Sequence, residues 1–263
     1  MDRINVKIDR TAEVASGAVI GSGSEIGPYC QIGSGVEIGE NTVLGSRVEI
    51  TGRTRLGPNN QIFTGAILGQ AASYSNRRKQ LGGVSKDEDF DLIIGDNNII
   101  REYSVIYGSK RIGVEKEPTV IGDDNFLMAY IQIKPGARLG SGITIANSSV
   151  VDEGCQIGDE AFLAGLAYIP EEVKVGRLSM VGACARIIDS LPPFLLADGN
   201  PARIESMNVV GIRRADISRK AFSEIKTIYK KFSRDNGDIP IREMKLETEE
   251  GKELQKFILE EVN

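Results

Sequence analysis

The 263-residue chain contains no histidine and no tryptophan, and only 6% of its residues are aromatic. Without histidine it lacks the side chain that most often serves as a general base near neutral pH. The scarcity of aromatic residues argues against a thick aromatic core. No apolar run approaches the roughly 18–20 residues needed to cross a bilayer, and residues 1–10 lack the apolar region of a secretory signal. We therefore expect a cytoplasmic protein without a transmembrane segment.

An excess of basic residues is also missing. The formal net charge is −5, which argues against nucleic acid as the main partner because phosphate neutralisation needs a basic face. Cys30, Cys155 and Cys184 form a sparse, odd set without metal-ligand spacing, as expected in a reducing compartment. We predict no metal site and no cofactor. A nucleophilic thiol usually needs a cationic neighbour, so we interpret the cysteines as small residues buried in turns.

What the chain does contain is a repeat of six residues, rich in glycine. Helices would space apolar residues by three and four, and strands by two, so a strict six fits neither. The aliphatic residue of each repeat is found at Ile8, Val14, Ile20, Ile26, Ile32, Ile38, Leu44, Ile50, Leu56, Ile62, Leu68, Ile94, Ile100, Ile106, Ile121, Leu127, Ile133, Leu139, Ile145, Val151, Ile157, Leu163, Ile169, Val175, Val181 and Ile187.

This period predicts an all-β fold, the parallel β-helix, over residues 1–190. Each repeat forms a short strand and a tight turn, and three repeats close one triangular coil. Successive coils stack about 4.8 Å apart through backbone hydrogen bonds. The aliphatic residues then point inward and form a thin, continuous core of about eight or nine coils.

Two segments interrupt the period, near residues 70–91 and 108–119, and we predict that both leave the prism as loops. The first carries Arg77, Arg78 and Lys79. Long loops in a compact repeat are usually functional or disordered. Because a smooth β-helix has no cleft of its own, these loops are natural walls for a site. A merely solvated excursion is the alternative.

Residues 191–263 break the pattern and predict a connection followed by a C-terminal α-helical subdomain. Within the segment that begins at about Ile212, apolar residues at three- and four-residue steps from Ile217 to Phe232 indicate a helix. Asp216 or Ser218 would cap its start, and the Asn236-Gly237 pair marks its end. A second helix is expected over 248–263, and the two would close the end of the solenoid. The connection contains Pro192, Pro193 and Pro201, which favour extended backbone.

Several segments resemble one family of hexapeptide-repeat transferases. They include "EIGPYCQIGSGVEIGENTVLGSRVEITGRTRLGPNNQI", "IGDNNIIREYSVI", "VIGDDNFLM", "ANSSVV" and "LPPFLLADGNPARIESMNVVGIRR". Together with the paired C-terminal helices, these segments resemble the bacterial UDP-N-acetylglucosamine O-acyltransferase of lipid A synthesis. The resemblance covers nearly the whole chain. The "DGNPA" junction leading to "GIRR" is more specific than the repeat, which many acyl- and acetyltransferases share.

The resemblance implies a left-handed coil, a homotrimer and active sites in grooves between adjacent prisms. An acyl chain would arrive as a thioester on acyl carrier protein and pass to the 3-hydroxyl of the sugar nucleotide. A basic groove rim suits that acidic carrier. The candidate carrier-binding residues are Arg177, Arg203, Arg213 and Lys220.

The nucleotide-binding positions are only partly retained. Asn208 and Arg214 match family residues that contact the nucleotide, whereas Ala215 replaces a family arginine and Val210 a family glutamate. Ala183 stands near a family glycine that leaves room for a long acyl chain. Its extra methyl group predicts a shorter chain, although a small residue packed in a turn explains it equally well.

The chain departs from the family where the family keeps its histidines. An ungapped match places Gln132 and Pro135 at two of them, the second being the general base, and Gly154 and Pro170 at two more. A sugar hydroxyl attacks a thioester poorly unless a positioned group takes its proton, which is typically worth roughly 10²–10⁴-fold. Proline has no side-chain proton acceptor, although a backbone amide such as that of Gly136 could supply an oxyanion donor.

A carboxylate is the nearest substitute base. Three repeats make one coil, so Pro135, Glu153 and Glu171 should form one column, with Lys134 and Asp152 in the adjacent one. Repulsion between stacked glutamates can raise one pKa toward neutrality, which would suit Glu153 as a base. Solvated glutamates, with Lys134 paired to either neighbouring acid, are the alternative.

Three functions stay open on the sequence. The chain is an acyltransferase with unusual base chemistry, a catalytically silent paralogue that binds a sugar nucleotide or an acyl carrier, or an acetyltransferase that uses acetyl-CoA. The helical tail favours the lipid A family over small acetyltransferases. Retained Asn208 and Arg214 favour nucleotide binding, whereas the missing histidines favour altered substrate or lost activity.

Overall fold

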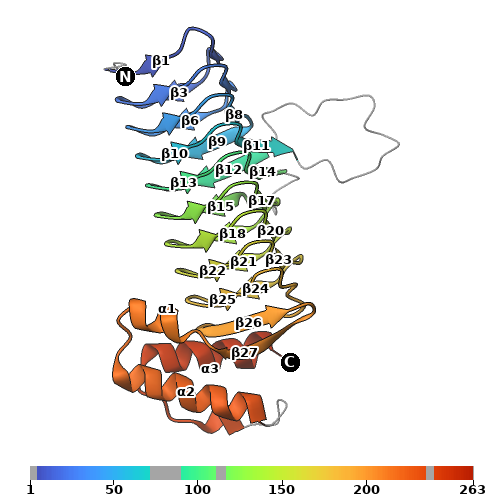
Figure 1. Cartoon of the computed structure of the whole chain (residues 1–263). Coiled ribbons are helices and arrows are strands. Elements are labelled where there is room, and N and C mark those ends of the chain that lie inside the picture. The colour runs from blue at the N-terminus through green and yellow to red at the C-terminus, as the bar shows by residue number, and fades with distance from the viewer. Residues whose placement is uncertain (1–4, 72–89, 111–116, 235–239, 263) are drawn as a thin grey trace.

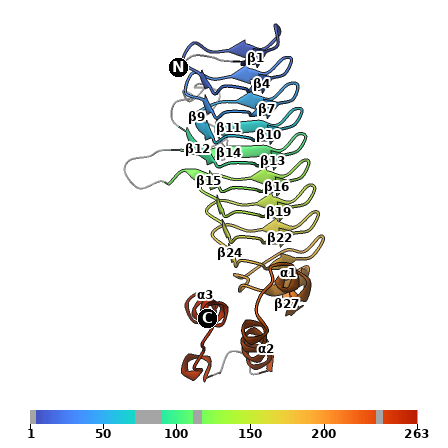
Figure 2. The same ribbon diagram turned by 90° about the vertical axis from the view of Figure 1, so that its left-hand side faces the viewer.

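The structure, a computed structural model, is a triangular prism of short strands with helices gathered beneath its last coil (Figures 1 and 2). It describes residues 5–71, 90–110, 117–234 and 240–262. The two predicted excursions fall largely outside these ranges, as do Arg77, Arg78 and Lys79.

Each coil contributes one strand to each of three faces, called A, B and C. Face A holds β1 (Lys7–Ile8), β4 (Glu25–Ile26), β7 (Val43–Leu44), β10 (Gln61–Ile62), β13 (Ile99–Ile100), β16 (Phe126–Leu127), β19 (Thr144–Ile145), β22 (Phe162–Leu163) and β25 (Met180–Val181). Face B holds β2 (Glu13–Val14), β5 (Gln31–Ile32), β8 (Glu49–Ile50), β11 (Ile67–Ala71), β14 (Val105–Lys110), β17 (Gln132–Ile133), β20 (Val150–Val151) and β23 (Tyr168–Ile169). Face C holds β3 (Val19–Ile20), β6 (Glu37–Ile38), β9 (Arg53–Leu56), β12 (Phe90–Ile94), β15 (Thr119–Ile121), β18 (Arg138–Leu139), β21 (Gln156–Ile157) and β24 (Lys174–Val175).

Strands of one face pair in parallel with a shift of one coil. In the uninterrupted part, Gln132 pairs with Val150 and Val150 with Tyr168. The predicted inward aliphatic residues are all buried except Ile8, which is 38% exposed, and Val14, which is half-buried. Both lie in the first described coil. The parallel β-helix and its core are therefore confirmed.

The corner that joins face C to face A, called corner CA, holds a ladder of buried asparagines. The Asn98 backbone N–H donates to Asn60 Oδ1 at 2.8 Å, and the Asn125 N–H donates to Asn98 Oδ1 at 3.0 Å. The Ile143 N–H continues the ladder by donating to Asn125 Oδ1 at 2.8 Å. These amide side chains satisfy backbone groups that the tight turns would otherwise leave buried without partners.

The strands beside the two excursions are longer than the two-residue strands of the regular coils, and they pair with each other. β12 and β14 run antiparallel, with Asp91 opposite Ser109, while β12 also continues the parallel stacking of β9 and β15. The Arg53 guanidinium holds the start of β12 through two bonds to the Asp91 carboxylate, at 2.8 and 2.9 Å. The chain thus returns to the repeat in phase.

The prism ends in a hairpin that the sequence did not predict. β26 (Leu195–Gly199) pairs in parallel with β25 and so extends face A, and β27 (Ala202–Met207) pairs antiparallel with β26. The prolines were predicted to favour extended backbone, and the segment is extended. The antiparallel return was missed because the expected connection had no strand periodicity of its own.

The helical subdomain consists of α1 (Val209–Arg214), α2 (Arg219–Arg234), η3 (Pro240–Glu243) and α3 (Glu249–Glu261). The helix expected after Asp216 or Ser218 is confirmed as α2, whereas the short α1 before it was not expected. Asp216 adopts a left-handed φ of 52° between the two helices. Ser218 caps α2, its Oγ accepting from the Ala221 N–H at 3.1 Å. Thr248 caps α3 in the same way. Within the described ranges, no helix is both long and apolar enough to cross a membrane.

Candidate functional site

The expected site lies at the corner that joins face B to face C, called corner BC, on the coils of β17, β20 and β23. The Gly154 N–H donates to the Pro135 carbonyl at 3.1 Å, and the Glu172 N–H donates to the Glu153 carbonyl at 2.8 Å. These bonds confirm the predicted column of Pro135, Glu153 and Glu171. Pro135 is buried, Glu153 is half-buried and Glu171 is exposed.

Lys134 brings a buried positive charge to this corner. Only 6% of the residue is exposed, and its Nζ donates to Gln132 Oε1 at 2.8 Å. The same Nζ lies 4.6 Å from the centre of the Tyr107 ring. Burying an ammonium group is costly unless it is compensated, and an amide oxygen and an aromatic face both compensate it. Gln132 thus serves here as a partner of Lys134.

Two acids and a phenol stand on the next coils of corner BC. Tyr168 Oη donates to Asp152 Oδ2 at 2.8 Å, and the Glu153 backbone N–H donates to Asp152 Oδ1 at 2.9 Å. The hydrogen bond to Asp152 raises the pKa of the Tyr168 phenol, and burial raises it further. A phenol held protonated in this way is a poor base. Glu153, beside it, is the carboxylate that our sequence hypothesis selects.

The backbone of this corner is already engaged. The Gly136 N–H donates to Thr119 Oγ1 at 3.0 Å, and Gly136 adopts a left-handed φ of 73°. The expectation that this amide is available as an oxyanion donor is therefore wrong for this conformation. Lys134, two residues before Gly136 in the chain, brings a fixed positive charge to this corner.

A second feature is a groove of about 450 Å³ between the end of face A and α2. Its lining is mainly apolar and includes Met180, Leu196, Asn208 and Val210, with Lys226 and Lys230 from α2. Sequence reasoning did not single out the two lysines. Their spacing of four residues, which places both on one helix face, was the available signal.

Asn208 lies in this groove but is used by the fold. Its Oδ1 accepts from the Gly211 N–H at 3.0 Å and so caps α1, while its Nδ2 donates to the Leu178 carbonyl at 2.8 Å. The residue is buried, with 6% exposed. Arg214, in the last turn of α1, is exposed, and so is Ala183, at the corner joining face A to face B (corner AB).

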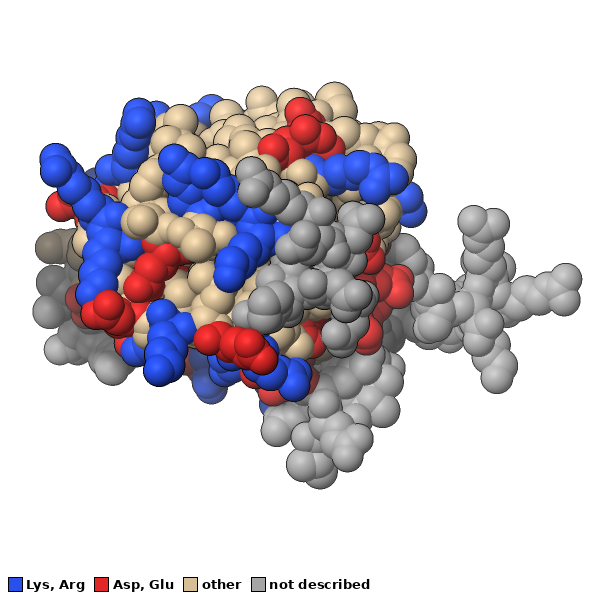
Figure 3. Space-filling model, turned by 90° about the horizontal axis from the view of Figure 1, so that it is seen from below, with Lys and Arg blue, Asp and Glu red and all other residues tan. Residues whose placement is uncertain are grey.

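The four candidate carrier-binding residues have different surroundings. Arg177 Nε bonds Glu253 Oε2 at 2.7 Å and its guanidinium stacks on Phe194, so it helps to hold α3 against the prism. Lys220 pairs with Glu247. Arg203 and Arg213 are exposed. Figure 3, seen from the helical end, shows Lys and Arg spread over this face with Asp and Glu between them.

The cysteines mostly follow the interpretation as small turn residues. Cys30 and Cys155 are buried, and Cys155 Sγ donates to the Pro170 carbonyl at 2.8 Å. Burial raises the pKa of the Cys155 thiol to about 12, which leaves it protonated near neutral pH. Cys184 is exposed, so the interpretation of a buried residue is wrong there. Among the described residues, no group of His, Cys, Asp and Glu could hold a metal ion.

The fold and its repeat define a class, the hexapeptide-repeat transferases with a left-handed β-helix. The family model for bacterial transferase hexapeptide repeats matches residues 17–52. The model for "Udp N-acetylglucosamine O-acyltransferase; Domain 2" matches residues 191–261.

Individual relatives narrow the class to one family. The chain is similar to LpxA from Acinetobacter baumannii, at 31% identity and a TM-score of 0.87, over 97% of each chain. It is also similar to LpxA, a UDP-N-acetylglucosamine acyltransferase from Bacteroides fragilis, at 25% identity and a TM-score of 0.86, over 97% of this chain and 98% of the other. The chain therefore belongs to the UDP-N-acetylglucosamine O-acyltransferase family.

Curated relatives align over a shorter part. The acyl-[acyl-carrier-protein]–UDP-N-acetylglucosamine O-acyltransferase of Burkholderia thailandensis is 34% identical over 165 residues, 62% of this chain and 61% of the relative. The enzyme of the same name from Gloeothece citriformis is 35% identical over 177 residues, 67% of this chain and 60% of the relative. The match thus spans less than two thirds of the length of these curated relatives.

Proposed function

We propose that this protein transfers an acyl chain from acyl carrier protein to the 3-hydroxyl of UDP-N-acetylglucosamine. One observation carries the proposal: the structure matches the LpxA of Acinetobacter baumannii over 97% of both chains, including prism and helical subdomain. The curated relatives bear names that state this donor and this acceptor. A lone hexapeptide prism would support only the broader class.

In the proposed reaction, Glu153 takes the place of the missing histidine. Its carboxylate accepts the proton of the sugar hydroxyl while the oxygen attacks the thioester carbonyl. The C–S bond then breaks, and the carrier thiolate leaves and is reprotonated. Lys134 lies one residue from Pro135 in the same corner, and its ammonium group would stabilise the negative charge that develops on the carbonyl oxygen.

The groove beside α2 would hold the nucleotide. The resemblance assigns Asn208 and Arg214 to nucleotide contact, and the groove adds Lys226 and Lys230 as positive charges for a diphosphate. Val210, 60% exposed, replaces a family glutamate with an apolar surface. Ala183 would border the site of the acyl chain, and its methyl group would favour a shorter acyl chain.

The segment that forms α1 and α2 would receive the acidic carrier. Residues 209–234 contain eight Lys and Arg against two Asp and Glu, a formal charge of +6 in a chain whose net charge is −5. A local positive field of this kind steers a negative partner and speeds association. Arg203, Arg213 and Lys220 belong to this side of the molecule, with Arg177 at the junction to the prism.

We also propose a cytoplasmic homotrimer, assembled along corner AB. Large apolar side chains project there: Tyr103, Tyr130 and Leu166 are 50%, 58% and 60% exposed. The Tyr103 and Tyr130 rings stack with centroids 5.4 Å apart. Exposed apolar patches of this kind mark protein interfaces. Light scattering on the purified protein would test this, and a monomeric mass would contradict it.

The activity is tested by incubating the purified protein with acyl carrier thioesters of several chain lengths and UDP-N-acetylglucosamine, followed by mass spectrometry. An acetyl-CoA arm tests the acetyltransferase alternative. We expect acylated sugar nucleotide from carrier thioesters and none from acetyl-CoA. Product from acetyl-CoA alone would overturn the proposed donor.

Binding without turnover is the second candidate function. One observation favours it: the chain has no histidine to serve as the general base. Calorimetric binding of UDP-N-acetylglucosamine with no product in the assay would establish this alternative and overturn the transfer proposal.

A further inference from the structure

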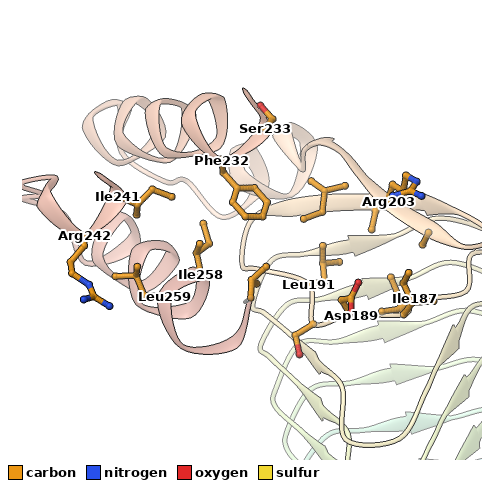
Figure 4. Close-up of a pocket in the computed structure, with 16 residues that line it drawn as sticks. Ile187, Asp189, Leu191, Arg203, Phe232, Ser233, Ile241, Arg242, Ile258 and Leu259 are labelled. Carbon is orange, nitrogen blue, oxygen red and sulfur yellow. The ribbon is translucent and has the colours of Figure 1, made fainter. Parts of the chain in front are cut away.

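A cavity of about 620 Å³ separates the last coil of the prism from the helical subdomain (Figure 4). Its volume lies within the roughly 300–1,000 Å³ range of small-molecule sites. The apolar part of its lining includes Ile187, Leu191, Ile204, Phe232, Ile241 and Ile258. The cavity begins at corner BC one coil beyond Glu171 and shares no lining residue with the groove beside α2. The proposed transfer reaction leaves it unused.

Contacts on both sides hold the cavity between two fixed walls. On one side, α3 is tied to the prism by Lys174 Nζ and Glu261 Oε1, which lie 2.6 Å apart. On the other side, Tyr229 Oη of α2 donates to the Glu205 carbonyl of β27 at 3.0 Å. Because these contacts hold both walls in place, the cavity is a fixed feature of the subdomain.

Polar groups stand at the two ends of the cavity. Arg203 and Asp189 lie at the prism end, and Arg242 lies at the end formed by η3 and α3 (Figure 4). Arg203 and Arg242 are both exposed. An anion at the prism end would meet the Asp189 carboxylate, whereas Arg242 offers a planar guanidinium that can pair with a carboxylate through two bonds.

We propose that this cavity binds a single-chain fatty acid, with its acyl chain along the aliphatic lining and its carboxylate against Arg242. An apolar lining with a cation at its water-facing end matches an apolar tail with an anionic head. The head stays partly hydrated at the mouth, so its charge need not be buried. This inference concerns a free acid and not a thioester, so it stands or falls independently of the transfer reaction.

The absence of tryptophan supplies the test. Phe232→Trp places a sole indole in the cavity lining, and Ile188→Trp, at a residue 42% exposed, places one at its rim. Tyr130→Trp on corner AB is the control. A brominated fatty acid quenches indole fluorescence on contact. We expect saturable quenching in the two cavity variants and none in Tyr130→Trp.

The charge assignment is tested in the Ile188→Trp background. Arg242→Gln should raise the half-saturating fatty acid concentration about tenfold, the effect of losing one charge-assisted pair. The matched variant Arg203→Gln should change the half-saturating concentration less than about twofold. A brominated fatty alcohol, which has no carboxylate, should bind the Ile188→Trp protein as weakly as the fatty acid binds the Arg242→Gln variant.

Three results would overturn the proposal: no saturable quenching in either cavity variant, equal quenching of Tyr130→Trp, or equal weakening by the two arginine changes. Thermal unfolding of the unaltered protein with and without laurate covers the case in which a tryptophan disturbs folding. Stabilisation that Arg242→Gln removes supports the site, and the absence of stabilisation contradicts it.

Discussion

Corners CA and BC lie on the same coils and follow similar backbone paths, yet their side chains serve different ends. At corner CA, Asn98 and Asn125 accept from backbone amides of the neighbouring coil. At corner BC, Lys134, Gln132, Asp152 and Tyr168 bond mainly to one another. A side chain that hydrogen-bonds a backbone group is required by the fold. Two side chains that hydrogen-bond each other can be replaced together without a change in the backbone. We therefore expect substitutions at corner CA to lower stability and substitutions at corner BC to change activity.

The largest effect is expected from Glu153→Gln at corner BC. If Glu153 is the base, transfer falls by roughly 10²–10⁴-fold, mainly in kcat. Glu171→Gln, one coil further in the same column and exposed, should change the rate less than about twofold. Steady-state assays of both variants make the comparison. Unchanged turnover in Glu153→Gln would refute the assignment.

At corner CA, Asn125→Ala should lower the free energy of unfolding by about 2–4 kcal/mol. It leaves the Ile143 N–H and the Gly140 carbonyl buried without their partner, at about 1–3 kcal/mol each. Asn147→Ala is the control, because Asn147 is exposed although its Oδ1 also accepts a backbone N–H, that of Ala129. Its cost should stay under about 1 kcal/mol. Urea unfolding that shows equal losses for the two variants would contradict the structural role assigned to the buried asparagine ladder.

Lys134→Met sharpens the comparison, because it separates stability from chemistry within corner BC. Removing the buried ammonium leaves Gln132 Oε1 without its donor and should lower the free energy of unfolding by about 1–3 kcal/mol. Transfer should fall about tenfold, through the loss of one charge-assisted interaction. Urea unfolding and kcat are measured together. A loss of stability with kcat intact would give Lys134 a structural role only.

The smallest effect is a pH dependence. The pKa of Tyr168 is raised in the folded state, so its protonated form is the stabilising one. Its contribution is present below the unfolded pKa of about 10 and is lost as pH rises through the folded value. Tyr168→Phe should therefore cost under about 1 kcal/mol at pH 7 and progressively less above pH 10. A cost that is constant from pH 7 to pH 11 would contradict this.

Most of the prism could be predicted because each coil repeats the same six-residue pattern. An aliphatic residue at every sixth position buries itself on the coil below, so the inward residues from Ile20 to Ile187 followed from spacing alone. The hairpin of β26 and β27 did not follow, since it has no period, and the break between α1 and α2 depends on a single left-handed residue, Asp216.

The site was predicted in part. The column of Pro135 and Glu153 follows from the arithmetic of the coil and was confirmed by backbone bonds. The contact of Lys134 with Tyr107 crosses the second excursion, and the cap formed by Asn208 depends on the geometry of the subdomain. When an irregular segment lies between two residues, the number of residues that separates them in the sequence does not predict whether they are in contact.

The in-phase return of the chain after each excursion also limits how such a protein can change. Partners in uninterrupted coils are eighteen residues apart, as Gln156 and Lys174 are. One residue inserted into a turn would shift every later side chain and turn aliphatic residues outward. Whole loops can be added, because they leave the coil and rejoin it. Chemistry at a corner is therefore revised by replacing side chains on an unchanged path, and the proposed exchange of histidine for Gln132 and Pro135 would be a revision of this kind.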